Sequence, residues 1–303
     1  MRVAATQINI IFGDVQVNLQ KALSLIHEAA SQNAEVVVLP EFFTSGIAIH
    51  PIVDEIAFKN HECRVIEILL EQAQKHNILI CGSLLSSRGT DTYNTIFIIE
   101  PCGNIFCHNK DIPTQFEHCY YTYGDTHRSH KIFGVAFCWE MLRSKTLREF
   151  DPHIQLVLAG SCWWGLPQTS KNEELKLYNQ KLNRNTPKIF AKLAGLPLVH
   201  ASLKGNTQGS RHLDDPTFVE RPLIGTTQII NASGEVLKCI DDTDDDAVIV
   251  ESILLAERIN QPIPKEFWLL PLREEYLRAW DMENALGKQI YRAKRETHDH
   301  ENS

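Results

Sequence analysis

Three residues able to do covalent chemistry each follow a stretch that is typical of a buried strand. Glu41 follows VVVLP, Lys110 ends the segment GNIFCHN, and Cys138 ends GVAF. In an open α/β sheet, sites form beyond the carboxyl ends of the strands. The set predicts a Cys138 nucleophile for a carbonyl or nitrile carbon, with Glu41 taking the thiol proton and later activating water. Lys110 would stabilise the developing oxyanion. Taken singly, a cysteine at a strand end is usually core, and a Glu or Lys there is usually solvated.

The elements that must position these residues are those of an α/β domain. Continuous β-branched runs indicate strands covered on both faces, and apolar residues at helical spacing indicate helices. The polar and aromatic segment 111–129 reads as a long loop of the functional kind. Pro187 is expected to break or kink a long helix, and 204–207 to be an exit loop. The expected strands are 2–11, 36–39, 78–83, 94–100, 103–108, 134–137, 155–159, 198–202, 226–231, 235–240 and 247–252, and the helices 18–31, 61–77, 144–150, 173–195 and 272–292.

The bulk composition indicates a soluble globular protein. Of its 303 residues, 43% are hydrophobic and 22% charged, and the formal charge is −8. A mildly acidic chain without a basic cluster is a poor candidate for binding nucleic acid or an anionic membrane. The start, MRVAATQINI, lacks a signal-peptide core, and no apolar run approaches the roughly 20 residues that span a bilayer. Eight scattered cysteines favour reduced thiols, so we expect a cytoplasmic location.

The three segments together resemble those of the carbon–nitrogen hydrolase (nitrilase) superfamily, whose members use a Glu-Lys-Cys triad in this chain order. Further similar text includes AATQINIIFGDVQVN, GSLL, YNTIFIIEPCGNI and PLIGTTQIINASGEVL, so the resemblance covers about residues 1–252. It implies a four-layer α-β-β-α sandwich, a cofactor-free and metal-free reaction, and a homodimer or larger homo-oligomer. It also matches Glu117 to a second glutamate that would hold Lys110 and position water or the leaving ammonia.

The resemblance divides the chain into a hydrolase domain, 1–255, and a C-terminal tail, 256–303. The tail places Tyr276 and Trp280 on one helical face, which needs a surface to bury against. That surface could be the parent domain or a second subunit. We favour the second subunit and therefore expect the tail to form an interface.

The nucleophile motif lies between two branches of the superfamily. Amidase-type members usually read Cys-Tyr-Asp, whereas this chain reads Cys138-Trp139-Glu140. Trp and Glu are similar to the nitrilase text, but nitrilases typically continue with Asn where this chain has Met141. The expected function is a small-molecule amidase that releases ammonia and an acid through a thioester, and the alternative is a nitrilase. In either case the Trp139 backbone N–H would contribute to the oxyanion site.

Several residues are candidates for shaping the substrate pocket. Trp163 and Trp164 would narrow it and favour an apolar or planar acyl group, although they could equally be core aromatics. Tyr121 is a candidate pocket wall. Arg143 could clamp a substrate carboxylate, which would favour ω-amido acids, or pair with Glu140 or Glu149.

Three other features have mainly structural interpretations. Cys162 is a second thiol at a strand end, without a glutamate–lysine pair to single it out. The acidic turn DDTDDD, 241–246, reads as a solvated loop rather than a metal site. A metal- or ligand-binding protein could use Cys102, Cys107, His108 and Cys119, but their spacing fits no standard zinc template. A catalytically silent family member that binds a partner is the remaining alternative.

Overall fold

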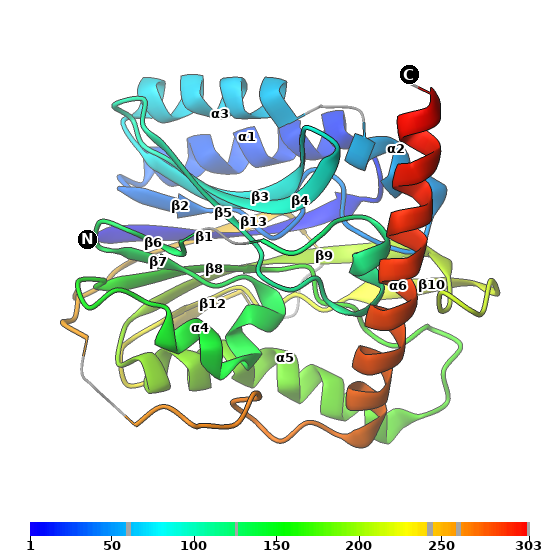
Figure 1. Cartoon of the computed structure of the whole chain (residues 1–303). Helices are drawn as coiled ribbons and strands as arrows, with labels where there is room; N and C mark the ends of the chain where they lie inside the picture. The colour runs from blue at the N-terminus through cyan, green and yellow to red at the C-terminus, as the bar shows by residue number, and fades with distance from the viewer. Residues whose placement is uncertain (59–61, 125–126, 241–244, 259–261, 302–303) are drawn as a thin grey trace.

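The chain folds around one large sheet whose two halves pack face to face between layers of helices (Figure 1). The structure is a computed structural model that describes residues 1–58, 62–124, 127–240, 245–258 and 262–301. Within this part of the chain, the main strand order is β5-β4-β3-β2-β1-β9-β8-β7-β6. Strands β1 and β9 pair in parallel at the join between the halves. The arrangement confirms the expected four-layer α-β-β-α sandwich.

The first half of the sheet carries the N-terminal strands. Its outer face is covered by α1 and α3, and α2 packs against β3 (Figure 1). β2 runs parallel to both β1 and β3, so it ends at the same edge as they do. The elements are β1 (Arg2–Ile11), α1 (Val15–Ser31), β2 (Val36–Val38), α2 (Pro51–Phe58), α3 (Glu62–His76), β3 (Leu79–Arg88), β4 (Asp91–Ile99) and β5 (Ile105–Asn109).

The second half is covered by α4 and α5 on the opposite outer face (Figure 1). Its strands β7, β8 and β9 are mutually parallel. The elements are β6 (Ser129–His130), β7 (Phe133–Val135), α4 (Ser144–Arg148), β8 (Leu156–Ser161), α5 (Glu173–Ala194), β9 (Leu198–Ser210), β10 (Phe218–Leu223), β11 (Gln228–Ile230), β12 (Val236–Cys239) and β13 (Ala247–Ser252). Two 3₁₀ helices, η1 (Gln115–Cys119) and η2 (Cys138–Leu142), follow β5 and β7.

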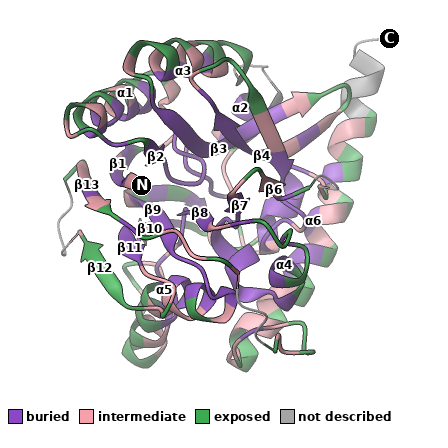
Figure 2. Cartoon of the chain, turned by 90° about the vertical axis from the view of Figure 1, so that its left-hand side faces the viewer, coloured by how far each residue is buried: buried purple, intermediate pink, exposed green. Residues whose placement is uncertain are grey.

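Strand β2 explains why the central strands are apolar without alternation. Val36 and Val38 join the cluster between the two halves of the sheet, while Val37 joins the cluster under α1 and α3. Both faces are therefore dry, as expected for parallel strands sandwiched by other layers. Figure 2 shows the same pattern, with buried strands inside and exposed outer faces on α1, α3 and α5.

Two local predictions were wrong, and both errors have a physical reason. Strand 198–202 extends to Ser210 as β9 because its second half pairs with β10, a strand that the sequence pattern did not indicate. Helix α5 is not broken at Pro187 but runs from Glu173 to Ala194. Thr186 directly precedes Pro187, and its hydroxyl donates to the carbonyl of Leu182, one helical turn before it, at 2.7 Å. Both residues are buried by tertiary packing. Packing of this kind routinely overrides local propensity.

The C-terminal helix α6 (Glu274–Glu301) lies along the side of the chain's own sandwich and passes both halves of the sheet (Figure 1). Near its C-terminal end Arg295 pairs with Asp91 at 2.6 Å, and the Tyr291 hydroxyl accepts from the Thr92 N–H at 2.9 Å. Near its start, Tyr276 packs against Tyr178 of α5. The aromatic face of the tail therefore packs, partly buried, on the parent domain rather than standing free of it.

Two expectations concern segments of special composition. Residues 241–244 of the acidic turn lie outside the described part of the chain. No helix among the described residues is long and apolar enough to cross a membrane.

Candidate active site

Glu41, Lys110 and Glu117 form a buried chain of charges at the edge where β2 and β5 end. The Lys110 Nζ lies 2.9 Å from Glu41 Oε1 and 3.0 Å from Glu117 Oε2. All three side chains are inaccessible to solvent. Burial alone would lower the pKa of Lys110, but the charges of Glu117 and Glu41 raise it well above its ordinary value. Lys110 is therefore a permanent cation between two carboxylates.

Glu41 is held by polar groups from three parts of the chain. Its Oε1 also accepts from Asn94 Nδ2 of β4 at 3.0 Å, and its Oε2 accepts from the Cys162 backbone N–H at 3.1 Å. Burial raises the pKa of Glu41, and the Lys110 charge only partly opposes that rise. A carboxylate with a raised pKa, fixed in one orientation, is suited to accept and return a proton.

Cys138 sits at the apex of a strained turn. β7 ends at Val135, and the backbone of Cys138, the first residue of η2, adopts φ +52°. Few residues other than glycine occupy this left-handed region, and such strain concentrates at functional sites. Burial raises the pKa of the Cys138 thiol well above its ordinary value, the Glu41 charge adds to the rise, and the Lys110 charge opposes it. The resting group is therefore a thiol that needs a base.

Gly160 of β8 lets the two sides of the site approach each other. A Cβ at this position would lie 2.6 Å from the Phe137 ring and 2.9 Å from the Glu41 backbone nitrogen. Both contacts are shorter than real Cβ atoms make, so any larger residue would push Glu41 and the Cys138 turn apart. The glycine thus fixes the distance between the carboxylate and the thiol.

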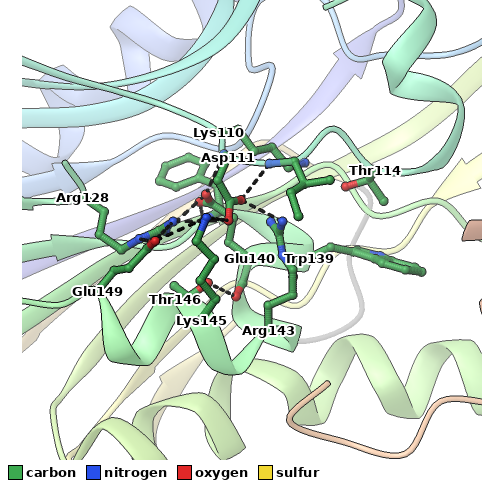
Figure 3. A network of polar contacts seen from close by, with 12 residues as sticks. Lys110, Asp111, Thr114, Arg128, Trp139, Glu140, Arg143, Lys145, Thr146 and Glu149 are labelled. Carbon is green, nitrogen blue, oxygen red and sulfur yellow. Dashed lines mark hydrogen bonds and ion pairs between the residues drawn. The ribbon is translucent and has the colours of Figure 1, made fainter. Parts of the chain in front are cut away.

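Glu140 joins the Cys138 turn to the end of β5 (Figure 3). One carboxylate oxygen accepts from the Phe137 N–H at 2.9 Å, and the other accepts from the Asp111 N–H at 3.3 Å. His108 at 3.0 Å and Arg128 at 3.2 Å complete the cluster. Burial alone would raise the pKa of Glu140. Neighbouring charges, chiefly that of Arg128, instead hold this pKa well below its ordinary value. This anion therefore fixes Lys110 and Cys138 relative to each other.

A cavity of about 590 Å³ opens beside Cys138. Its wall includes Trp139, Trp163 and Trp164, together with Tyr276 and Ala279 of α6. The volume is that of a pocket for a small molecule, and most of such a molecule would be buried. Trp280 of α6 stacks on Trp139 with ring centroids 5.5 Å apart and planes within 4°. The C-terminal helix therefore supplies one wall of the cavity and supports the residue next to the thiol.

A family model of carbon–nitrogen hydrolases matches residues 2–256. The chain belongs to the carbon–nitrogen hydrolase family. Its sequence is similar to Nitrilase 3 of Arabidopsis thaliana, with 27% identity over 46% of this chain and 47% of the relative. It is also similar to the aliphatic nitrilase of Rhodococcus rhodochrous, with 24% identity over 86% of this chain and 78% of the relative. The chain thus spans about half the length of the plant relative.

An amidase relative and two solved structures extend the comparison. The 2-oxoglutaramate amidase of Bacillus subtilis is 27% identical over 55% of this chain and 66% of the relative. A carbon–nitrogen hydrolase from Helicobacter pylori has a TM-score of 0.71 at 19% identity, covering 84% of this chain and 89% of that chain. A nitrilase-superfamily amidase from Nesterenkonia has a TM-score of 0.64 at 17% identity, covering 82% and 90%. These structures support the nitrilase-like fold.

In this carbon–nitrogen hydrolase, the predicted pocket residues fall into two groups. Trp139, Trp163 and Trp164 line the cavity beside Cys138. Tyr121 does not line it, and its hydroxyl instead donates to Glu117 Oε2, which also accepts from the Thr114 N–H at 2.8 Å. Tyr121 is thus a partner of the buried charge chain rather than a wall of this cavity.

Arg143 is fully buried and does not line the cavity of this hydrolase. Its Nη1 lies 2.7 Å from Asp111 Oδ1, and its Nε donates to the Trp139 carbonyl at 3.2 Å (Figure 3). Its ion-pair partner is therefore neither Glu140 nor Glu149, the two that the sequence suggested. The proposed carboxylate clamp at Arg143 gains no support from this geometry.

Sequence reasoning missed several groups that shape the site. The Asn94 side chain and the Cys162 backbone N–H hold Glu41, and Gln115, with φ +54°, lines the cavity. The strain at Gln115 leaves no sequence signal, because any residue type can be forced into it by its surroundings. Cys162 is itself one of the residues that line the cavity, so two cysteines border it. Among the described residues, no group of three potential metal ligands gathers in one place.

Proposed function

We propose that this carbon–nitrogen hydrolase is a small-molecule amidase with Cys138 as nucleophile. The observation that carries the proposal is the fully buried Glu41–Lys110–Glu117 chain beside a strained cysteine that opens into a cavity. None of these three buried side chains is exposed to water, so solvent does not screen the electrostatic effect of their charges on a bound substrate. Burying these charges lowers the stability of the fold through loss of their hydration. Such buried charges are typical of functional sites, where they can activate a nucleophile such as Cys138.

The geometry supports a two-stage reaction. Glu41 takes the thiol proton as Cys138 Sγ attacks the amide carbon, and the oxyanion is held by Lys110 and the Trp139 backbone N–H. Glu41 then gives that proton to the nitrogen as the C–N bond breaks, so ammonia leaves and a thioester remains. Water attacks the thioester while Glu41 takes its proton, and the Cys138 thiol is restored as the carboxylic acid departs.

A nitrilase is the second candidate, because the aliphatic nitrilase relative aligns with most of this chain. A panel of short amides, matching nitriles and carbamoyl compounds separates the two, with ammonia and the acid product measured for each. An amidase releases ammonia from the amides, whereas a nitrilase converts the nitrile to acid and leaves the matching amide intact. No turnover, together with a Cys138 that does not react with an alkylating reagent near neutral pH, would favour a catalytically silent protein.

Glu117→Gln is expected to shift the acid limb of the kcat/KM profile to lower pH. Activity requires the Glu41 carboxylate, so it is lost as the pH falls through the raised pKa of Glu41. The Glu117 charge contributes to that rise, so removing it lowers the pKa of Glu41. Profiles normalised to their maxima measure the shift. Glu149→Gln, a half-exposed carboxylate of the neighbouring network, should leave the limb in place; a limb that moves upward in Glu117→Gln contradicts the assignment.

Ala279→Leu is expected to narrow the cavity from the α6 side. Each added methylene in a tight pocket changes discrimination by about tenfold or more, so kcat/KM should fall at least that much for long or branched acyl amides. The shortest amide should change little. Ala285→Leu, at an exposed position of the same helix, is the matched control. An unchanged ratio of long to short substrates in Ala279→Leu would mean that α6 does not bound the acyl site.

A further inference from the structure

The cavity beside Cys138 has two arginines and a histidine on the wall formed by the β9–β10 hairpin. Arg211 and His212 follow β9, and Arg221 lies within β10. The one described carboxylate on the cavity wall is Glu275, which already pairs with Arg273 at 3.3 Å. The lining thus combines tryptophan and tyrosine rings on one side with guanidinium groups on another.

Arg221 is the least compensated of these cations. Its Nη2 donates to the Arg211 carbonyl, and no carboxylate of the described part of the chain lies within ion-pair distance of it. Burial lowers the pKa of Arg221, the Arg211 charge lowers it further, and Glu283 only partly offsets both. The Glu283 carboxylate is engaged elsewhere, 2.6 Å from His212 Nδ1. A half-buried guanidinium in this state gains most from an incoming anion.

Arg211 and Trp164 complete the surroundings of Arg221. The Arg211 guanidinium has Asp215 at 3.5 Å, and both side chains are partly exposed to solvent, so the pair contributes little to stability. Trp164 lines the cavity with both arginines, and its Nε1 donates to the Ile47 carbonyl at 3.1 Å, which fixes the ring. A short acyl chain could lie along this ring, with the thiol at one end and the guanidinium groups at the other.

We propose that the cavity selects amides that carry a carboxylate at the end opposite the scissile bond, received by Arg221 with Arg211. The inference rests on the proposed function and names its substrate class, short ω-amido acids. A guanidinium fork binds a carboxylate through two parallel N–H···O bonds, which gives orientation as well as affinity. Arg143 cannot take this role without first giving up Asp111, whereas Arg221 has no carboxylate to give up.

The first test compares two amides of equal length, glutaric acid monoamide and an analogue with an isopropyl group in place of the carboxylate. The wild type should prefer the monoamide, and Arg221→Gln should lower its kcat/KM by about tenfold or more while the neutral amide stays within about threefold. Arg221→Lys should recover part of the loss. Arg278→Gln, on the exposed face of α6, should change neither value. Equal losses on both amides, or a wild type without preference, would overturn the proposal.

A second measurement needs no turnover and no variant. Glutarate should protect Cys138 of the wild type from alkylation by iodoacetamide at concentrations where pentane-1,5-diol, a neutral compound with the same number of carbon atoms and no amide to hydrolyse, does not. Equal protection by both compounds, or none, overturns the carboxylate site. Protection by glutarate alone without hydrolysis of any amide or nitrile supports the carboxylate site and rejects the proposed reaction, so the two failures are distinguishable. If Arg221→Gln fails to fold, the protection measurement and the same comparison of the two amides in Arg211→Gln still test the carboxylate site.

Discussion

Replacing Cys138 with alanine is expected to lower kcat for ammonia release by about four orders of magnitude or more, as loss of a covalent nucleophile does in other hydrolases. The fold should survive, because the thiol is small and its removal leaves the Glu41–Lys110–Glu117 chain intact. Stability should stay close to wild type, since the raised pKa keeps the Cys138 thiol neutral in the folded state and no buried charge is removed with it. Ammonia release and the thermal midpoint, measured on the same preparation, check both expectations.

Cys162→Ala provides the matched control for this variant. Cys162 lines the same cavity and is equally buried, and burial raises the pKa of its thiol as well. Its contribution to the site is the backbone N–H that donates to Glu41, which alanine retains. Cys162→Ala should therefore keep turnover within about a factor of ten, and mass spectrometry of a trapped thioester should place the adduct on Cys138. Turnover that survives in Cys138→Ala but not in Cys162→Ala would reverse the assignment.

The sequence predicts the elements that carry the charged residues because their signals are local. Val36 to Val38 are consecutive β-branched residues, a pattern that the dry faces of β2 explain. The ends of β2, β5 and β7 then place Glu41, Lys110 and Cys138 within a few residues of where the patterns stop. Their convergence follows from sheet geometry, in which sites gather beyond strand ends. The roles of these residues in a reaction stay predictions until activity is measured.

Contacts between distant segments were not predictable in the same way. The spacing of Tyr276 and Trp280 predicts an aromatic helix face. The local sequence does not indicate whether Trp139 of the same chain or a second subunit covers that face. Arg143 similarly has several acidic residues within reach in the sequence, and its partner, Asp111, is chosen by the position of the β5 end. Such choices depend on the packed geometry of elements far apart in the chain. Arg221 belongs to the same class, because β10 itself was not expected.

Lys110→Met is expected to lower turnover strongly and to destabilise the fold. Methionine fills the space but leaves Glu41 and Glu117 buried without a cation, and breaking a buried pair in this way costs about 3–5 kcal/mol. Losing the oxyanion partner should lower kcat by about two to three orders of magnitude. Lys131→Met, which removes an exposed lysine from its pair with Glu100, should leave the free energy of unfolding close to that of the wild type.

The pH dependence of Lys110→Met gives a sharper test than its stability at one pH. Without the cation, the pKa of the Glu41 carboxyl, which burial already raises, should rise further in the folded state. The folded form then binds more protons than the unfolded form, so stability falls as the pH rises. The deficit relative to wild type should be largest near neutral pH and shrink on acidification. Adding Glu117→Gln to Lys110→Met should restore part of the stability but none of the turnover, because one buried charge is removed and the oxyanion partner is still missing. A deficit that does not vary with pH would show that Lys110 stabilises by packing alone.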